Sequence, residues 1–403
     1  MRASVFTDAR LMKLAGRFAW LDVDTERPGN FAFVERFPIE VWPTILVIDP
    51  ADERVLLRWL GTATAAELER LLGDAERAHR KERGDAAGAE LARALELAAR
   101  RQHGEAAGAF EAALRAGGPR WPERTRTADA LLQALLMAGD PRACTGEAAR
   151  LLPGMERGPA YARVAAAGLD CATQLDEPAA REAAIRAVEP AARLALRVPG
   201  VLADDRLGLY GNLVAARKAL GDAAGSRRLA REWLAFAEDE ARRAPTPLGR
   251  SAYDGARLSA ALELGEARRV LPALRESARA LPEEYFAQSY QAVCALEAGE
   301  PREALEAARR AVALAEGPRK VRVMTVEAQA LHALGDDDGA RAALTAAIAH
   351  GEGLPEAVRP AGYLKAARRL RENWVQKVEP DSAAAPAPAA EPAPAPTAVP
   401  ATP

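Results

Sequence analysis

Aromatic residues, histidine and excess charge of either sign are scarce in this sequence of 403 residues. Only 5% of the residues are aromatic and four are histidine, although 49% are hydrophobic. The apolar mass is therefore mostly alanine and leucine, as in closely packed helices. The 55 basic and 57 acidic residues leave a net charge of -2. Without a basic excess, the composition gives no support for nucleic-acid binding.

Cysteine is also rare, and its spacing excludes several kinds of site. Cys144, Cys171 and Cys294 are far apart and lie in helical patterns. None belongs to a C-x-x-C pair, and no histidine stands at metal-ligand spacing. No Ser–His–Asp arrangement and no glycine-rich phosphate loop occurs either. We therefore expect three free buried thiols and no catalytic residue, cofactor or metal in the chain as written.

Long hydrophobic runs and a signal peptide are absent from the printed sequence. Without a transmembrane run, we expect no membrane insertion. Without a signal peptide, the chain as written is expected to be cytoplasmic. A signal peptide upstream of Met1 would instead place the protein in the periplasm.

Residues 1–74 contain the only strand-like runs of the sequence. Short apolar, β-branched or aromatic runs predict strands at 18–24, 44–50 and 54–60. The turn at 50–53 makes the last two strands a hairpin. Helices are predicted at 7–16, 29–36 and 64–80, the last one opened by Thr64 with Glu67 at capping-box spacing. The polar residues 75–88 predict the end of this helix and a linker.

This order of elements, together with the "VWPT" segment at 41–44, resembles the second half of a thioredoxin fold. In that family an X-Pro-Thr segment opens the fourth strand with a cis-proline beside the active-site thiols. Pro43 matches that proline, while Trp42 and Thr44 flank it. The resemblance implies a truncated α/β thioredoxin-like domain over residues 1–74, with a substrate groove at these three residues.

The redox motif of that family is missing from the chain. The first residues resemble a variant that reads C-x-x-C-H-x-M-x-x-x-x-F-x-D, with Met1, Phe6 and Asp8 on its last three named positions. The second cysteine would then lie three residues upstream of Met1. The run at 18–24 would also lack a neighbouring strand, and its unpaired backbone groups would be costly to bury. A mis-assigned start therefore explains the sequence better than natural truncation, and the chain as written cannot perform thiol–disulfide exchange.

Asp22 and Asp24 are paired carboxylates near the end of the run at 18–24. Such a pair can serve acid–base chemistry or bind a metal. No histidine or third carboxylate joins them, so we expect a structural role in capping a turn.

Residues 89–376 carry a repeating helical pattern. Turn glycines at 221, 265, 299 and 335 are separated by 44, 34 and 36 residues, with small residues at fixed offsets after them. This pattern resembles tetratricopeptide repeats, whose period is about 34 residues, with one insertion near 240–248. The resemblance implies stacked helix pairs, a closing helix near 355–376 and a curved binding surface. The residues 377–403, rich in proline and alanine, predict an extended tail.

The concave surface of such an array is lined by the first helix of each pair. The family positions predict partner-binding residues at Asn212, Lys218, Ser259, Ser289, Arg322, Gln329 and His332. The Lys/Asn clamp that some family members use for a C-terminal carboxylate is absent, because Gly211 and Ala215 stand where it would begin. No specificity for a peptide end is therefore expected.

Two hypotheses for function follow from these patterns. The first is an interaction scaffold that binds a protein or peptide partner and carries a redox-inactive, truncated thioredoxin-like module. The second is a thiol–disulfide oxidoreductase whose true N-terminus, with its C-x-x-C, is missing from this chain. An in-frame C-x-x-C-H in the DNA upstream of Met1 would favour the second hypothesis, and a stop codon there would favour the first.

Overall fold

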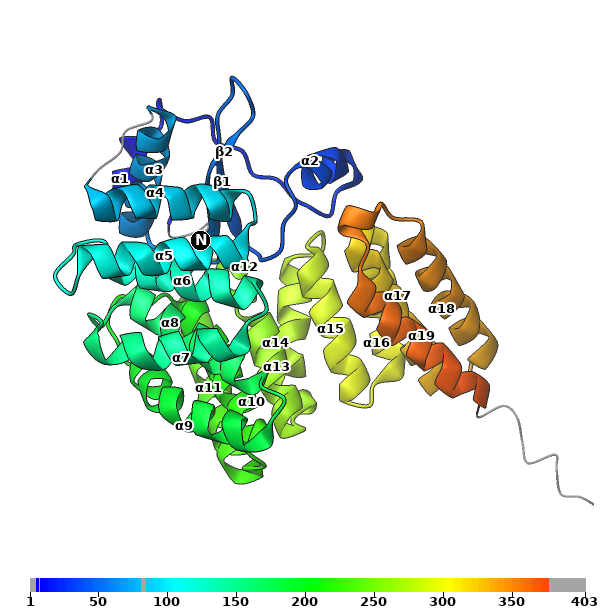
Figure 1. The fold of residues 1–403 in the computed structure, drawn as a ribbon. Helices are drawn as coiled ribbons and strands as arrows, with labels where there is room; N and C mark the ends of the chain where they lie inside the picture. The colour runs from blue at the N-terminus through cyan, green and yellow to red at the C-terminus, as the bar shows by residue number, and fades with distance from the viewer. Residues whose placement is uncertain (1–4, 7, 81–84, 377–403) are drawn as a thin grey trace, which may run out of the picture.

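The computed structural model describes residues 5, 6, 8–80 and 85–376 (Figure 1). Across these ranges helices are the dominant elements, and the strands form one two-stranded sheet. The expected mainly α class, with a helical-repeat array after a small N-terminal sheet, is confirmed. The predicted tail at 377–403, residue Met1 and part of the predicted linker lie outside the described residues.

The N-terminal module, residues 5–80, is built around a β-hairpin. Its elements are α1 (Ala9–Met12), the 3-10 helix η1 (Pro28–Asn30), α2 (Phe31–Arg36), β1 (Thr44–Ile48), β2 (Val55–Leu60) and α3 (Ala65–His79). The strands β1 and β2 pair antiparallel, with Thr44 opposite Leu60. The predicted hairpin is thus confirmed, as is the capping box in which Thr64 and Glu67 start α3.

Two predictions for this module are wrong. Residues 18–24 form no strand, because no neighbouring strand in the described chain supplies the backbone partners that a sheet requires. The helix predicted at 7–16 shrinks to the four residues of α1. Side chains of α1, β2 and α3 nevertheless share a small apolar core that includes Leu11, Leu57, Trp59 and Leu68.

The rest of the described chain is a helical array, α4–α19, of antiparallel pairs. The pairs are α4 (Ala86–Ala99) with α5 (His103–Gly117), α6 (Arg124–Met137) with α7 (Pro141–Leu151), α8 (Pro159–Thr173) with α9 (Pro178–Ala195), and α10 (Ala203–Ala219) with α11 (Ala223–Arg243). They continue with α13 (Asp254–Leu264) and α14 (Ala267–Ala280), α15 (Tyr285–Glu297) and α16 (Pro301–Leu314), and α17 (Gly317–Ala333) and α18 (Asp337–Glu352). The 3-10 helices η2 (Leu152–Gly154) and η3 (Glu356–Val358) lie in loops, and α19 (Ala361–Gln376) closes the array.

The glycine spacing and the alanine-rich composition both have a visible cause. The four marker glycines follow the first helices of their pairs with positive φ angles, and Gly265 ends α13 at φ 70°, where a side chain is disfavoured. The longest interval, between Gly221 and Gly265, contains the extra helix α12 (Pro247–Ser251). Alanine, leucine and valine side chains then fill one apolar core that runs from α4 to α17.

The expectation of three free thiols is wrong for two of the cysteines. Cys144 of α7 and Cys171 of α8 form a disulfide, with their Cα atoms 6.1 Å apart. These helices approach closely because Gly168 has no side chain: a Cβ there would lie 2.4 Å from the Cβ of Ala148. Cys294 is free and buried, as expected, and burial raises the pKa of its thiol to about 12.

The last helix covers the end of the array. Leu364 of α19 is buried against Leu344 and Ile348 of α18, and Leu370 and Trp374 pack beside it. This is the capping role that the sequence predicts for residues 355–376. Within the described ranges, none of the helices has the length and apolar character needed to cross a membrane.

Candidate partner-binding site

The N-terminal module packs on one end of the array through β2 and α3. Strand β2 lies against α4, and the Arg58 guanidinium donates to the carbonyl of Ala99 at 3.4 Å. Figure 1 shows the hairpin and α3 beside α4 at this end. The first helices α6, α8 and α10 contact one another in succession and reach the module through the side chains of Arg126, Arg163 and Asp205.

A single arginine of α8 connects these pieces. Arg163 donates to Glu67 of α3, to Asp129 of α6 at 2.8 Å, and lies 3.6 Å from Asp205 of α10. Its guanidinium also lies over the Trp59 ring, 5.5 Å from the centroid. The Thr62 hydroxyl donates to Asp205 beside it. The module is therefore fixed on the array by a buried charged network.

This network perturbs the carboxylates that it contains. Burial raises the pKa of Asp129 to about 6, in spite of Arg163. Burial likewise raises the pKa of Asp205, while Arg163 lowers it less. For Glu67, burial acts in the same direction but Arg163 and the α3 N-terminus outweigh it, so its pKa is lowered. One cation thus faces three carboxylates in a structural network. Among them, Asp129 is the carboxylate whose protonation state changes near pH 6.

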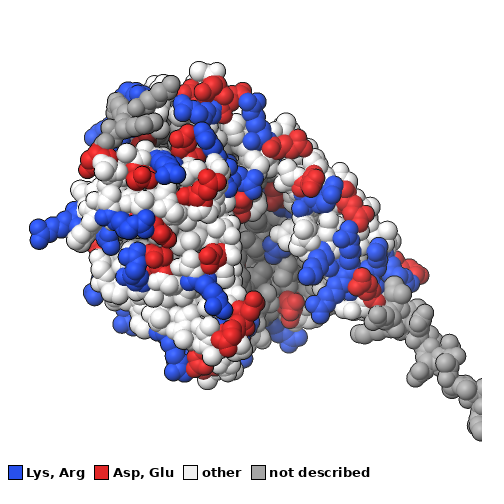
Figure 2. Space-filling view, viewed as in Figure 1, with Lys and Arg blue, Asp and Glu red and all other residues white. Residues whose placement is uncertain are grey.

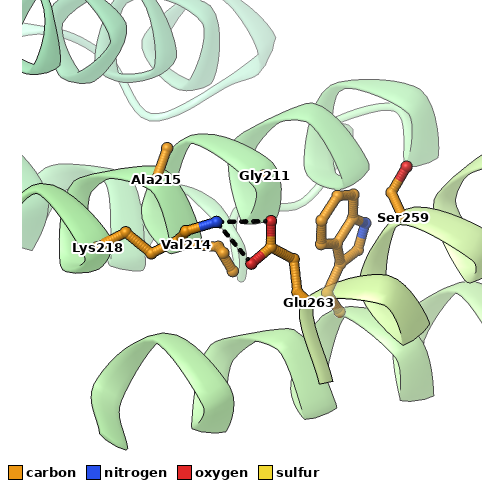
Figure 3. A pocket seen from close by; sticks show the side chains of 7 residues that line it. Gly211, Val214, Ala215, Lys218, Ser259 and Glu263 are labelled. Carbon is orange, nitrogen blue, oxygen red and sulfur yellow. Dashed lines mark hydrogen bonds and ion pairs between the residues drawn. The ribbon is translucent and has the colours of Figure 1, made fainter. Parts of the chain in front are cut away.

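An open pocket of about 300 Å³ lies further along the array, between α10 and α13. Gly211, Val214 and Ala215 of α10 line one side, Ser259 and Glu263 of α13 the other, and Trp233 of α11 lies between them. At its edge the Lys218 ammonium donates to both oxygens of Glu263, at 3.0 and 2.9 Å (Figure 3). We call this the α10–α13 pocket. Its walls are largely apolar and its edge carries one cation and one anion.

The structure brings together some of the predicted binding residues in this pocket. Lys218 and Ser259 are both exposed and line it, together with Gly211 and Ala215, where the sequence shows the carboxylate clamp to be absent. Asn212 does not line the pocket, because its amide donates to the Ala166 carbonyl of α8 at 3.0 Å.

The other predicted residues of the array do not line the α10–α13 pocket. Ser289 is only 1% exposed, so it is out of reach of a partner in this structure. Arg322, Gln329 and His332 lie on α17. The His332 ring stacks on Trp374 at 4.5 Å and pairs with Asp337, which gives it a structural role.

The three residues predicted for a thioredoxin-like groove lie on the N-terminal module. Trp42 is 66% exposed, and its indole N–H donates to the Thr25 hydroxyl at 3.0 Å. The Trp42–Pro43 bond is cis, as the resemblance implies. The Thr44 hydroxyl donates to the Val41 carbonyl at 2.5 Å. None of the three lines the α10–α13 pocket.

Sequence reasoning missed Trp233 and Glu263. Glu263 follows Ser259 by four residues on α13, so the same helix face could have been extended to include it. Trp233 comes from a second helix, whose side chains are expected in the core. The sequence could have indicated Trp233 only through composition, since large aromatic residues are rare in this alanine-rich array.

The described residues contain no group of three or more histidine, cysteine, aspartate or glutamate side chains that could hold a metal ion. Asp24, considered above for such a role, accepts from the Glu26 backbone N–H at 3.1 Å and so caps a turn. Figure 2 shows acidic and basic side chains interspersed over the visible face of the molecule.

Comparison with solved structures finds similar proteins, among them a repeat protein. No protein-family model matches this chain. No curated protein matches it either. A solved tetratricopeptide repeat protein from Parabacteroides merdae is 13% identical, with a TM-score of 0.42 over 71% of this chain and 100% of that chain. The assignment of a helical-repeat array rests on the helix pairs described above.

Proposed function

We propose that this chain is a protein-interaction scaffold whose array binds a segment of a protein partner at the α10–α13 pocket. The observation that carries the proposal is the open pocket itself, with an apolar wall around Trp233 and a Lys218–Glu263 pair at its edge. Ligand pockets combine an apolar surface with a few polar groups that fix the orientation of the ligand.

The chemistry of the lining suggests what the partner segment inserts. The Trp233 ring and the Val214 and Ala215 side chains favour an apolar side chain of the partner. Lys218 and Glu263 are accessible at the edge and can exchange their mutual contact for backbone groups of a bound segment. An exposed pair of this kind contributes only about 0–1 kcal/mol to stability, so its rearrangement costs little.

For the N-terminal module we propose a redox-inactive, thioredoxin-like domain over residues 1–74, joined by a linker at 75–88 to repeats at 89–376 and a tail at 377–403. The hairpin followed by α3 supports the resemblance. The three cysteines of the sequence all lie after residue 140, so the module has no thiol of its own. Disulfide exchange requires an attacking thiolate, and the module as written therefore serves as a binding domain.

We also propose that the protein resides in an oxidising compartment, which favours the periplasm over the cytoplasm. Disulfides between buried cysteines persist in such compartments and are rare in reducing ones. The support for this is the Cys144–Cys171 bridge. Alkylation of free thiols during cell lysis tests it, since a single reactive cysteine after denaturation is expected and three would contradict it.

Peptide selection from a display library against the whole protein tests the pocket. Ala215 is exposed, so Ala215→Trp should fill the pocket without disturbing the core and should weaken selected peptides at least ten-fold. Ala235→Trp, at an exposed position of α11 outside the pocket, is the matched control and should bind like the wild type. Selected peptides that bind both variants equally well would place the binding site elsewhere.

A further inference from the structure

A second contact between the N-terminal module and the array lies far from the first. The strap, residues 18–43, connects α1 to β1 and reaches the amino ends of α15 and α17. There the Arg319 guanidinium lies 3.4 Å from the Asp24 carboxylate and 3.2 Å from that of Glu26. Helix α2 of the strap also packs on η3, and Figure 1 shows it beside α17.

Glu26 binds the array as a carboxylate ligand would. Its second carboxylate oxygen accepts from the backbone N–H of Arg319 at 2.8 Å, in the first turn of α17. The first N–H groups of a helix have no partner within the helix, and the helix dipole favours an anion at this end. The guanidinium and the helix end therefore hold one carboxylate together.

The array is shaped for this close approach. Gly317, the first residue of α17, has φ 51°. A Cβ at this position would lie 2.3 Å from the Glu26 carbonyl oxygen and 3.3 Å from the Phe31 ring. Only glycine leaves room for the strap backbone, so the contact is built into both segments.

Aromatic rings hold the arginine in position. The Arg319 guanidinium lies over the Phe286 ring at 4.9 Å and the Tyr285 ring at 5.6 Å from the centroids. Stacked arginines of this kind keep their planar fork available for carboxylates. Arg322 follows one turn later, half-buried, and has no carboxylate partner among the described residues. Its charge lowers the pKa of Tyr285 and Tyr290, which burial raises more strongly.

The bound segment is short and locally organised. The Asp24 carboxylate accepts from the Glu26 N–H, and the Asn30 amide donates to the Asp24 carbonyl at 2.8 Å. Leu21, next to it, is 84% exposed, so this part of the strap lies on the surface. Asp24 and Glu26 are held by charged contacts near the surface, and such contacts can exchange with a competitor of the same chemistry.

We propose that the amino ends of α15 and α17 form a receptor for an acidic segment with an Asp-x-Glu pattern. The chain's own Asp24–Glu26 occupies this receptor, and a protein partner with an exposed segment of this kind binds by exchanging with it. The charge complementarity between Arg319, the amino end of α17 and the acidic segment identifies the partner. This inference goes beyond the proposed pocket, because it uses none of the pocket residues.

Hydrogen–deuterium exchange of the whole protein tests whether Arg319 holds the strap. Arg319→Ala should accelerate exchange of the amides at 20–33 at least ten-fold. Arg309→Ala removes another ion-paired arginine of the array, bound to Glu327 at 3.1 Å, and should leave the strap unchanged. Unchanged exchange of the strap in Arg319→Ala would overturn the proposal.

A labelled peptide spanning residues 20–30 tests exchange in trans. In wild-type protein the strap competes at an effective concentration of about 1 mM or more. The double variant Asp24→Asn with Glu26→Gln should therefore bind the peptide at least ten-fold more tightly than wild type, and adding Arg319→Ala should abolish binding. Equal binding to all three proteins, or none to the double variant at about 1 mM peptide, overturns the receptor. Ala215→Trp should leave this binding unchanged, which separates the receptor from the α10–α13 pocket.

Discussion

The N-terminal module and the helical array bury their apolar side chains to very different extents. The array has one apolar core that continues from α4 to α17. In the described chain, half of the ten large apolar side chains that remain exposed lie before residue 43, namely Phe6, Met12, Trp20, Leu21 and Trp42. The array is therefore self-sufficient, whereas the module depends on contacts outside its own small core.

The two regions also use different interactions. Helix pairs of the array stack through alanine and leucine, which are non-directional contacts that repeat along the chain. Besides the packing of β2 on α4, the module is held by the charged network of Arg163 at one end and by Arg319 at the other. Buried ion pairs contribute little net stability but are costly to break on one side only. Charge thus fixes where the module sits, and apolar packing makes the array stable.

Removal of Arg163 is expected to have the largest effect on the free energy of unfolding. Arg163→Ala leaves the buried Asp129 and the largely buried Glu67 and Asp205 without their cation, which should cost about 3–5 kcal/mol. Urea unfolding measures the loss, and hydrogen exchange should show that α3 is released first. Arg186→Ala, an exposed arginine of α9, is the control and should cost less than about 0.5 kcal/mol. A cost for Arg163→Ala as small as that would show that the network does not hold the module.

A matched pair of leucine substitutions tests the difference in packing between the array and the strap. Leu169→Ala, in the fully buried core of α8, should cost about 2–5 kcal/mol because it leaves a cavity. Leu21→Ala, in the exposed strap, should change stability by less than about 0.5 kcal/mol. Thermal and urea unfolding of both variants measure the difference, and similar costs at the two positions would contradict it.

The disulfide should stabilise the array and not the module. It closes a loop of 27 residues between α7 and α8, which corresponds to about 2–4 kcal/mol through restriction of the unfolded chain. We expect Cys144→Ala with Cys171→Ala to lower the free energy of unfolding by this amount in the absence of reductant. Under reducing conditions the variant and the wild type should converge, and a persistent difference would point to packing instead of the bridge.

The smallest expected effect is a dependence of stability on pH. The pKa of Asp129 is raised to about 6 in the folded protein, so the folded state holds its proton more strongly than the unfolded state. Stability should therefore fall as pH rises from about 4 to about 6, by at most about 1.4 kcal/mol per pH unit. Asp129→Asn should reduce this slope in urea unfolding at successive pH values, while Asp205, whose pKa is also raised, keeps a contribution of the same sign. The pKa of Glu67 is lowered in the folded protein, so Glu67 has the opposite effect. Its contribution to stability is present above about pH 4.5 and is lost as the pH falls.

The helices and the hairpin could be predicted because their signals are local. The glycine intervals, the Thr64–Glu67 capping box and the apolar run at 54–60 each depend on neighbouring residues. The prediction failed at 18–24, since an apolar run becomes a strand only when another strand pairs with it. In the candidate site, Lys218 and Ser259 followed from the repeat register, while Trp233 could not, because it reaches the pocket from a different helix.

By itself the sequence determined an alanine-rich helical array, its approximate period, its closing helix and a hairpin module before it. These features follow from periodicity and composition, which act over one or two turns of helix. Tertiary structure alone decided that Gly168 lets α7 and α8 approach closely enough for a disulfide and that Gly317 admits the strap. It also decided that one arginine meets carboxylates from three helices. Such contacts join residues 27 to 293 positions apart, and their geometry is set only when the helices have packed.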